Sequence, residues 1–201
     1  MSRHVRAQMV IAAMTTTFSL HVCADQVPAP GTVACADPFG RESARSDLVR
    51  AFGAASVVDQ EIEGHGGAGW LGTVIYPNDP RRQLEILWGD EVNRRLLAAI
   101  WIRGESQWTG WRKAHIGMTL EEVEVLNGKP FKLRGFETDD AGTVTAWQGG
   151  AMERIPGGCR FSVRFVPEDV FAELGGELVS SDPKVRSLRL TVSEIYTFYP
   201  K

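Results

Sequence analysis

The chain is poor in cysteine, in histidine and in long hydrophobic runs, with three cysteines and four histidines in 201 residues. Three cysteines are too few for a small protein held together mainly by disulfides. The net charge of −3 at pH 7 gives no basic footprint for nucleic acid, which is therefore not an expected partner. The 43% hydrophobic and 23% charged residues are typical of a folded globular protein and exclude a disordered chain, a collagen-like fibre and a polytopic membrane protein.

The first 24 residues have the pattern of a secretory signal peptide. Arg3 and Arg6 precede a mostly apolar run over Met9–Leu20, and small residues follow at Val22-Cys23-Ala24. A membrane-spanning helix needs about 20 apolar residues, and this run is shorter. We therefore expect cleavage after Ala24, export to the bacterial periplasm or cell envelope, and no transmembrane segment in the mature chain.

Different fates of this segment stay open. Bacterial lipoproteins carry lipid on a cysteine that follows leucine and two small residues, and Cys23 follows Leu20-His21-Val22, which fits that pattern badly. The segment could also be retained as a membrane anchor, or remain unprocessed at the start of a cytosolic protein. Cleavage after Ala24 removes two arginines and no acid, which leaves 20 basic and 25 acidic side chains and a net charge of −5.

Processing also leaves two cysteines, Cys35 and Cys159. An even pair in an exported protein favours a disulfide over two separate buried thiols. The closed loop would exceed 100 residues, for which the chain-entropy relation gives about 4–5 kcal/mol. Neither cysteine has a neighbour at the spacing of zinc ligands, and we expect no metal and no cofactor.

The mature chain divides into an extended, proline-rich lead-in over residues 25–42 and two units over 43–114 and 115–201, both within one compact domain. The first unit begins with a predicted helix at Ser43–Phe52, with Ser46 and Asp47 at its start and a stop at Gly53. In the second unit Thr119 and Glu122 form a capping box and Gly128 ends the helix.

Short apolar or alternating runs predict strands. They begin near Val57 and recur at Thr73–Tyr76, Leu84–Trp88, Leu96–Ile102, Phe131–Phe136, Thr143–Trp147, Cys159–Val166 and Val185–Tyr196. The run at 96–102 could also be helical, residues 64–72 have the composition of a glycine-rich loop, and 170–174 could hold a short helix. The predicted fold class is α+β, with short helices packed on one face of an antiparallel sheet. The two halves look alike, which suggests two tandem helix–strand units.

One motif carries a family resemblance. The segment Ile116–Pro130 is similar to the opening of the SmpA/OmlA (BamE-like) outer-membrane assembly lipoproteins and of the β-lactamase-inhibitor-protein fold. Residues 73–91 and 126–150 resemble a family of exported bacterial proteins with no established activity. The resemblance implies an envelope location and the same fold. The chain departs from the assembly lipoproteins because it lacks a convincing lipidation cysteine and has two units where they have one.

Two histidines are the candidates for catalysis. His65 lies in a His-Gly-Gly run of the kind that forms an oxyanion hole in α/β-hydrolases, but that fold also needs a G-x-S-x-G turn. The nearest match, Gly104–Trp108, lacks the second glycine. His115 precedes the second helix. A periplasmic hydrolase that uses His65 or His115 with nearby carboxylates is thus the alternative function.

Six tryptophans are many for a chain of this length. Trp108 and Trp111 lie among polar residues, and Trp70 and Trp147 lie beside glycine-rich loops. Because tryptophan is enriched at binding anchors, these four are the candidate exposed contact surface, with core packing as the competing interpretation. The predicted function is a non-catalytic envelope protein that binds another envelope protein or a wall or lipid component. The oligomeric state stays open.

Overall fold

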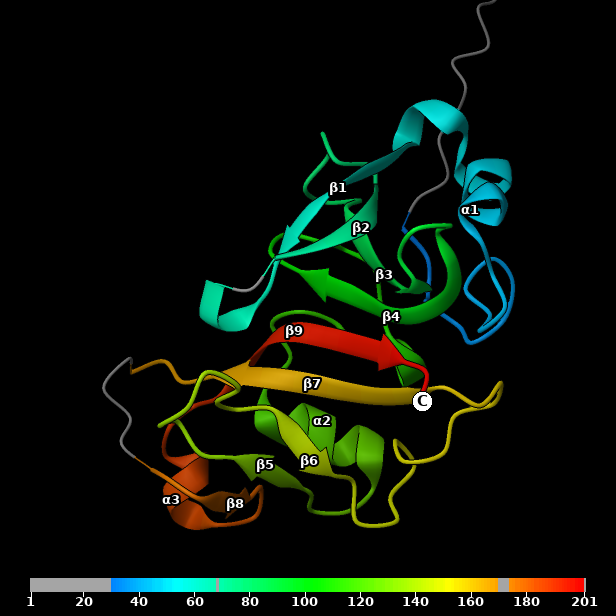
Figure 1. Cartoon of the computed structure of the whole chain (residues 1–201). Coiled ribbons are helices and arrows are strands. Elements are labelled where there is room, and N and C mark those ends of the chain that lie inside the picture. Colours follow the sequence, from blue (N-terminus) through cyan, green and yellow to red (C-terminus); the bar gives the residue numbers. More distant parts are fainter. Residues whose placement is uncertain (1–29, 68, 170–173, 201) are drawn as a thin grey trace, which may run out of the picture.

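Strands, rather than helices, make up most of this protein. The computed structural model describes residues 30–67, 69–169 and 174–200 and places nine strands there, in two antiparallel sheets (Figure 1). The described α-helices are short: Arg45–Phe52 (α1), Leu120–Asn127 (α2) and Pro183–Arg186 (α3). The predicted α+β class, with helices packed on one face of a sheet, is therefore wrong, and the fold is mostly β.

The larger sheet has six strands in the order β1-β2-β3-β4-β9-β7. Its strands are Val57–Glu63 (β1), Gly69–Ile75 (β2), Leu84–Asp90 (β3), Arg95–Arg103 (β4), Arg160–Val166 (β7) and Thr191–Phe198 (β9). Strands β1 to β4 form a meander of neighbouring hairpins, and β9 joins it by pairing with β4. One sheet therefore contains strands from both predicted units.

The smaller sheet has three strands in the order β6-β5-β8, which are Lys132–Arg134 (β5), Val144–Ala146 (β6) and Glu177–Val179 (β8). It is linked to the larger sheet by an antiparallel bridge between Thr143 and Arg164. The Ser162 hydroxyl also donates to the Val144 carbonyl at 2.9 Å. Figure 1 shows this sheet beyond β7, with α2 beside it.

Strand content exceeds the expectation because part of the predicted glycine-rich loop is paired. Glu63 is in register with Gly69, so β2 begins at Gly69 and residues 69–72 of that loop belong to a strand. The turn between β1 and β2 includes the 3-10 helix His65–Gly67 (η2). Residues 96–102 are a strand rather than a helix, since β4 pairs with β3 on one side and β9 on the other. The strand expected from Val185 begins at Thr191, because α3 and a turn precede it.

Local capping signals place both longer helices. The Thr119 side chain accepts from the Glu122 amide at 3.3 Å, and Glu122 accepts from the Thr119 amide at 2.8 Å, which confirms the predicted capping box. Gly128 ends α2 in the left-handed conformation. For α1 the cap is Ala44 rather than Ser46, and the Asp47 carboxylate accepts from its amide. Two further 3-10 turns are Ala54–Ser56 (η1) and Trp111–Lys113 (η3).

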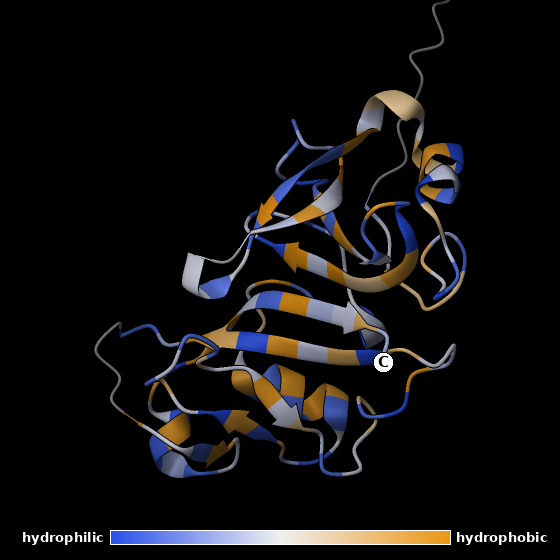
Figure 2. Ribbon diagram, in the orientation of Figure 1, coloured by the Kyte–Doolittle hydropathy of each residue, from blue (hydrophilic) through white to orange (hydrophobic). Residues whose placement is uncertain are grey.

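The core lies against one face of the large sheet. Figure 2 shows hydrophobic and hydrophilic residues alternating along β7 and β9, as expected when only one face of a strand is buried. The buried side chains of the central strands include Ile86, Ile100, Ile102, Val163 and Ile195. Leu120 and Val123 of α2 and Leu48 of α1 complete this core. The opposite face of β4 and β9 carries polar and aromatic side chains.

The predicted disulfide is confirmed: Cys35 and Cys159 are bonded, with their Cα atoms 5.9 Å apart and a sequence separation of 124. It ties the lead-in to the start of β7. Near it, Thr32 forms a parallel β-bridge with Thr109, and the Val33 amide donates to the Thr109 carbonyl at 2.8 Å. The expected signal peptide, Cys23 and residues 170–173 lie outside the described residues. None of the helices in the described part of the chain has the length and apolar character of a membrane span.

Candidate functional site

Two of the four predicted contact tryptophans belong to the core. Trp108 and Trp147 are each only 6% exposed, so the expectation that they lie on an exposed surface is wrong. The Trp108 indole donates to the Arg82 carbonyl and packs edge-on against Phe39 and Phe52. The Trp147 indole donates to the Phe161 carbonyl. Polar sequence neighbours and nearby glycines did not predict exposure here, because segments distant in sequence cover both rings.

The remaining two predicted tryptophans are accessible to different degrees. Trp111 is half-buried, and its indole donates to the Ala151 carbonyl at 3.2 Å. Trp70 of β2 is 36% exposed. Its ring meets the Trp101 ring edge-on, with centroids 5.7 Å apart and planes at 88°. Of the four candidates, Trp70 is the one that leads to a larger cluster of functional side chains.

That cluster is the aromatic face, which we define as His65, Trp70, Trp101 and Tyr196. Trp101 of β4 and Tyr196 of β9 are register partners, so both side chains project from the same face of the sheet. Their rings meet edge-on with centroids 5.6 Å apart. Trp101 thus lies between Trp70 and Tyr196, and both contacts have the edge-to-face geometry that aromatic rings prefer.

A charged row crosses the sheet beside these rings. Arg103 of β4, Glu194 of β9 and Arg164 of β7 are successive register partners. Arg164 Nη1 lies 3.0 Å from Glu194 Oε1. Arg103 Nε lies 2.8 Å from an oxygen of the buried Glu85 carboxylate, and the Arg103 guanidinium also lies 5.1 Å from the centroid of the Trp101 ring. Each of these arginines is therefore paired with a carboxylate beside the aromatic face.

His65 is brought onto the aromatic face by the turn between β1 and β2. Its Nε2 lies 2.9 and 3.0 Å from the two carboxylate oxygens of Glu194. Its ring stacks on Trp101, with planes 10° apart and centroids separated by 6.2 Å, and meets Tyr196 edge-on. Gly64 permits this arrangement, because a Cβ added there would collide with the Trp70 ring. An ionised carboxylate only accepts hydrogen bonds, so Nε2 carries the proton.

The Glu194 carboxylate is the electrostatic centre of the cluster. Burial alone would raise its pKa, but hydrogen bonds from Tyr196 and His65, together with the charges of His65 and Arg164, lower it below its ordinary value. Tyr196 donates its hydroxyl proton to the same carboxylate. Burial, and then that hydrogen bond and the negative charge of Glu194, raise the pKa of Tyr196. The cluster therefore holds an ionised acid beside a neutral phenol.

His115 is separate from this cluster. It is exposed, and its Nδ1 lies 3.1 Å from the Lys113 carbonyl oxygen. Of the predicted histidines and tryptophans, His65 and Trp70 are the two that belong to the aromatic face, where each contacts Trp101. Sequence reasoning missed Glu194, Tyr196 and the role of Trp101. The available signal was the alternation in β9, where Ile195 and Thr197 are buried while Glu194 and Tyr196 are partly exposed.

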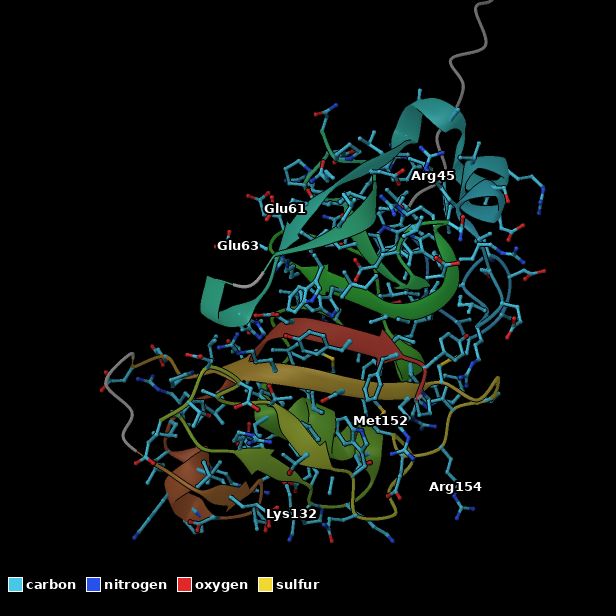
Figure 3. The ribbon with its side chains drawn as sticks, in the orientation of Figure 1. Arg45, Glu61, Glu63, Lys132, Met152 and Arg154 are labelled. Carbon is cyan, nitrogen blue, oxygen red and sulfur yellow. A yellow bond between two sulfur atoms is a disulfide. The ribbon has the colours of Figure 1, made fainter. Side chains whose placement is uncertain are left out.

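A polar groove lies elsewhere, between β7 and the turn that follows β6. It has a volume of about 720 Å³, and its walls include Gln148, Arg154 and Arg160. The buried Asn127 holds one wall, since its amide donates to the Trp147 carbonyl and accepts from the Met152 amide. In Figure 3 Arg154 projects outward from this region. Lys132 of β5 is the register partner of Ala146, which lines the groove.

Among the described residues, no three His, Cys, Asp or Glu side chains are grouped as metal ligands. Comparison of the chain with family models, with curated proteins and with solved structures gives no match. The resemblance of the segment around α2 to BamE-like and inhibitor-protein-like domains therefore stays a prediction, and the aromatic face has to be interpreted from its own geometry.

Proposed function

We propose that this chain is an exported interaction protein of the bacterial envelope that holds a protein partner through the aromatic face. The disulfide between Cys35 and Cys159 is compatible with export, since such bonds persist in oxidising compartments. The aromatic face combines exposed ring surface, hydrogen-bond donors and paired charges. Tyrosine, tryptophan and arginine are the residue types most enriched at the energetic centres of protein interfaces.

One observation carries this proposal. Four of the six indole N–H groups donate to acceptors within the described residues: those of Trp88, Trp108, Trp111 and Trp147. The remaining two, on Trp70 and Trp101, have no acceptor there, and both belong to the aromatic face. A buried indole normally finds a hydrogen-bond partner. These two tryptophans are therefore placed to offer their donors and their ring surface to another molecule.

A photo-crosslinking amino acid at Trp70 tests this function in intact cell envelope. The matched control carries the same group at Val125, which is 79% exposed on α2. We expect a discrete crosslinked protein from position 70 and none from position 125, with equal amounts of both variants. Crosslinking to lipid or wall material alone would show that the partner is that material and not a protein. Equal products from both positions, or none from position 70, would overturn the proposal.

Hydrolysis is a second candidate because of the contact between His65 and Glu194. In the neutral form of His65 that carries its proton on Nε2, the Nδ1 atom is an acceptor that could take a proton from a nucleophile. His115 provides the matched control, since it has no carboxylate partner in the described residues. Loss of biological activity in His65→Ala but not in His115→Ala would favour this reaction. Retained activity in both variants would exclude it.

A further inference from the structure

His65 occupies a box that has the chemistry of a cation-binding site. The box, defined as Trp101, Tyr196 and Glu194, has an aromatic floor, an aromatic wall and an ionised carboxylate. His65 stacks on the floor, meets the wall edge-on and donates to the carboxylate. Aromatic rings attract cations through the negative charge of their π faces, most strongly for tryptophan. A histidine side chain in this position therefore occupies the place of a bound ligand.

The geometry favours a planar cation over a spherical one. The imidazole plane is inclined by only 10° to the Trp101 ring, while its nitrogen lies within 3.0 Å of both Glu194 oxygens. A guanidinium group has the same two abilities, because it stacks on aromatic faces and binds a carboxylate through two parallel N–H groups. A lysine ammonium is not planar and can meet the carboxylate only as a point charge.

We infer that the box recognises an arginine side chain of the protein partner and that His65 is its resident occupant in the free protein. This inference rests on the proposed function, because it names the chemistry of the partner that the aromatic face holds. The binding step is an exchange: the arginine displaces the imidazole from Trp101 and Glu194. Since the binding-competent state excludes His65, the resident histidine lowers the apparent affinity.

The Glu194 carboxylate has room for a second guanidinium once His65 leaves. Its Oε1 atom accepts from Arg164 and its Oε2 atom from the Tyr196 hydroxyl, and each oxygen also contacts Nε2 of His65. An ionised carboxylate oxygen can accept two hydrogen bonds, so displacement of the imidazole frees one position on each oxygen. The whole chain is acidic, with a net charge of −3, which favours the approach of a basic segment.

Titration with blocked amino acids tests the inference on the intact folded protein. The probes are N-acetyl-arginine methylamide, its citrulline analogue, which is planar and neutral, and its lysine analogue, which is charged and not planar. Nuclear magnetic resonance of the Trp101 indole N–H follows binding. We expect weak saturable binding of the arginine probe, weaker binding of the lysine probe, and no binding of the citrulline probe.

The decisive variant is His65→Ala, for which we expect the arginine probe to bind about tenfold more tightly than to the wild-type protein. Glu194→Gln should abolish that binding in the His65→Ala background. If His65→Ala binds the probe no better or less well, the histidine is part of the recognition surface rather than its occupant, and the inference is wrong. Equal binding of the citrulline probe would also overturn it.

A measurement on the wild-type protein covers the case in which His65→Ala fails to fold. Displacement moves the imidazole away from the Trp101 ring, so the His65 ring protons should lose their aromatic ring-current shift as the arginine probe saturates. Unchanged His65 signals at saturation would overturn the inference. The two proposals fail separately. Crosslinking at position 70 without arginine binding would support the proposed function and overturn the inference about arginine. Arginine binding without crosslinking would overturn the proposed function, while the box would still be shown to bind arginine.

Discussion

Removal of the Cys35–Cys159 disulfide should cost a large part of the stability of this protein. The bond spans 124 positions, and the chain-entropy relation gives about 5 kcal/mol at 25 °C for a loop of that length. Domains of ordinary stability unfold with about 5–15 kcal/mol. The double variant Cys35→Ala/Cys159→Ala should therefore be only marginally folded at 37 °C, or unfolded.

The assay is urea unfolding at 25 °C, followed by tryptophan fluorescence and by circular dichroism, for the wild-type protein and the double variant. The calculated value assumes that the bond acts mainly by restricting the unfolded chain. In that case the variant should fold more slowly, while its unfolding rate constant changes little. The wild-type protein reduced by dithiothreitol is the control and should behave like the variant.

Two results would refute this reasoning. A loss below about 1 kcal/mol would show that the unfolded chain is already compact enough for the crosslink to restrict it little. An equally large loss that appears wholly as faster unfolding would show that the bond acts in the native state, by holding residues 30–42 against Trp108 and Thr109. Hydrogen exchange of the Val33 amide, which donates to the Thr109 carbonyl, would then rise sharply in the variant.

Three more substitutions test the packing and charge of the described residues. Asn127→Ala removes the bonds to Trp147 and Met152 and should cost about 2–4 kcal/mol in urea unfolding, whereas the exposed Asn93→Ala should cost less than about 0.5 kcal/mol. Gly64→Ala should cost about 1–3 kcal/mol by overpacking against the neighbouring indole, with a shifted near-ultraviolet spectrum. In the folded protein Glu194 has a pKa below its ordinary value of 4.5. Its ionised form therefore contributes to the free energy of unfolding above pH 4.5, and this contribution is lost as the pH falls through the folded pKa. The melting temperature of Glu194→Gln should therefore fall less steeply below pH 4.5 than that of the wild-type protein.

Local signals predicted the elements that depend on neighbours in sequence. The capping box at Thr119 and the glycine stop at Gly128 lie where the sequence puts them, because a cap is made by residues within one helical turn. The runs at 84–88 and 159–166 fall in β3 and β7, as their aliphatic and aromatic composition predicts. The disulfide followed from counting cysteines after the expected processing.

Pairings between distant segments could not be predicted in the same way. The six-stranded sheet forms because β9, near the C-terminus, pairs with β4, and no local pattern encodes that partnership. The predicted fold class was wrong for this reason: two clear helix signals outweighed strands whose partners were unknown. His65 and Glu194 lie 129 positions apart, so a single sequence shows the histidine but gives no sign of its carboxylate.

The tryptophans show why residue type alone could not identify the site. Trp108 and Trp70 stand in similarly polar or glycine-rich surroundings in the sequence, yet the former is 6% exposed and the latter 36%. The difference arises from what the chain lays over each ring. Phe39, in the lead-in fixed by the disulfide, packs against Trp108, whose indole is satisfied by a backbone carbonyl. Trp70 is covered on one side by the turn carrying His65 and keeps an indole donor with no acceptor among the described residues. Segments distant in sequence thus decide whether a tryptophan belongs to the core or to the surface. At the aromatic face these segments cover the rings only in part.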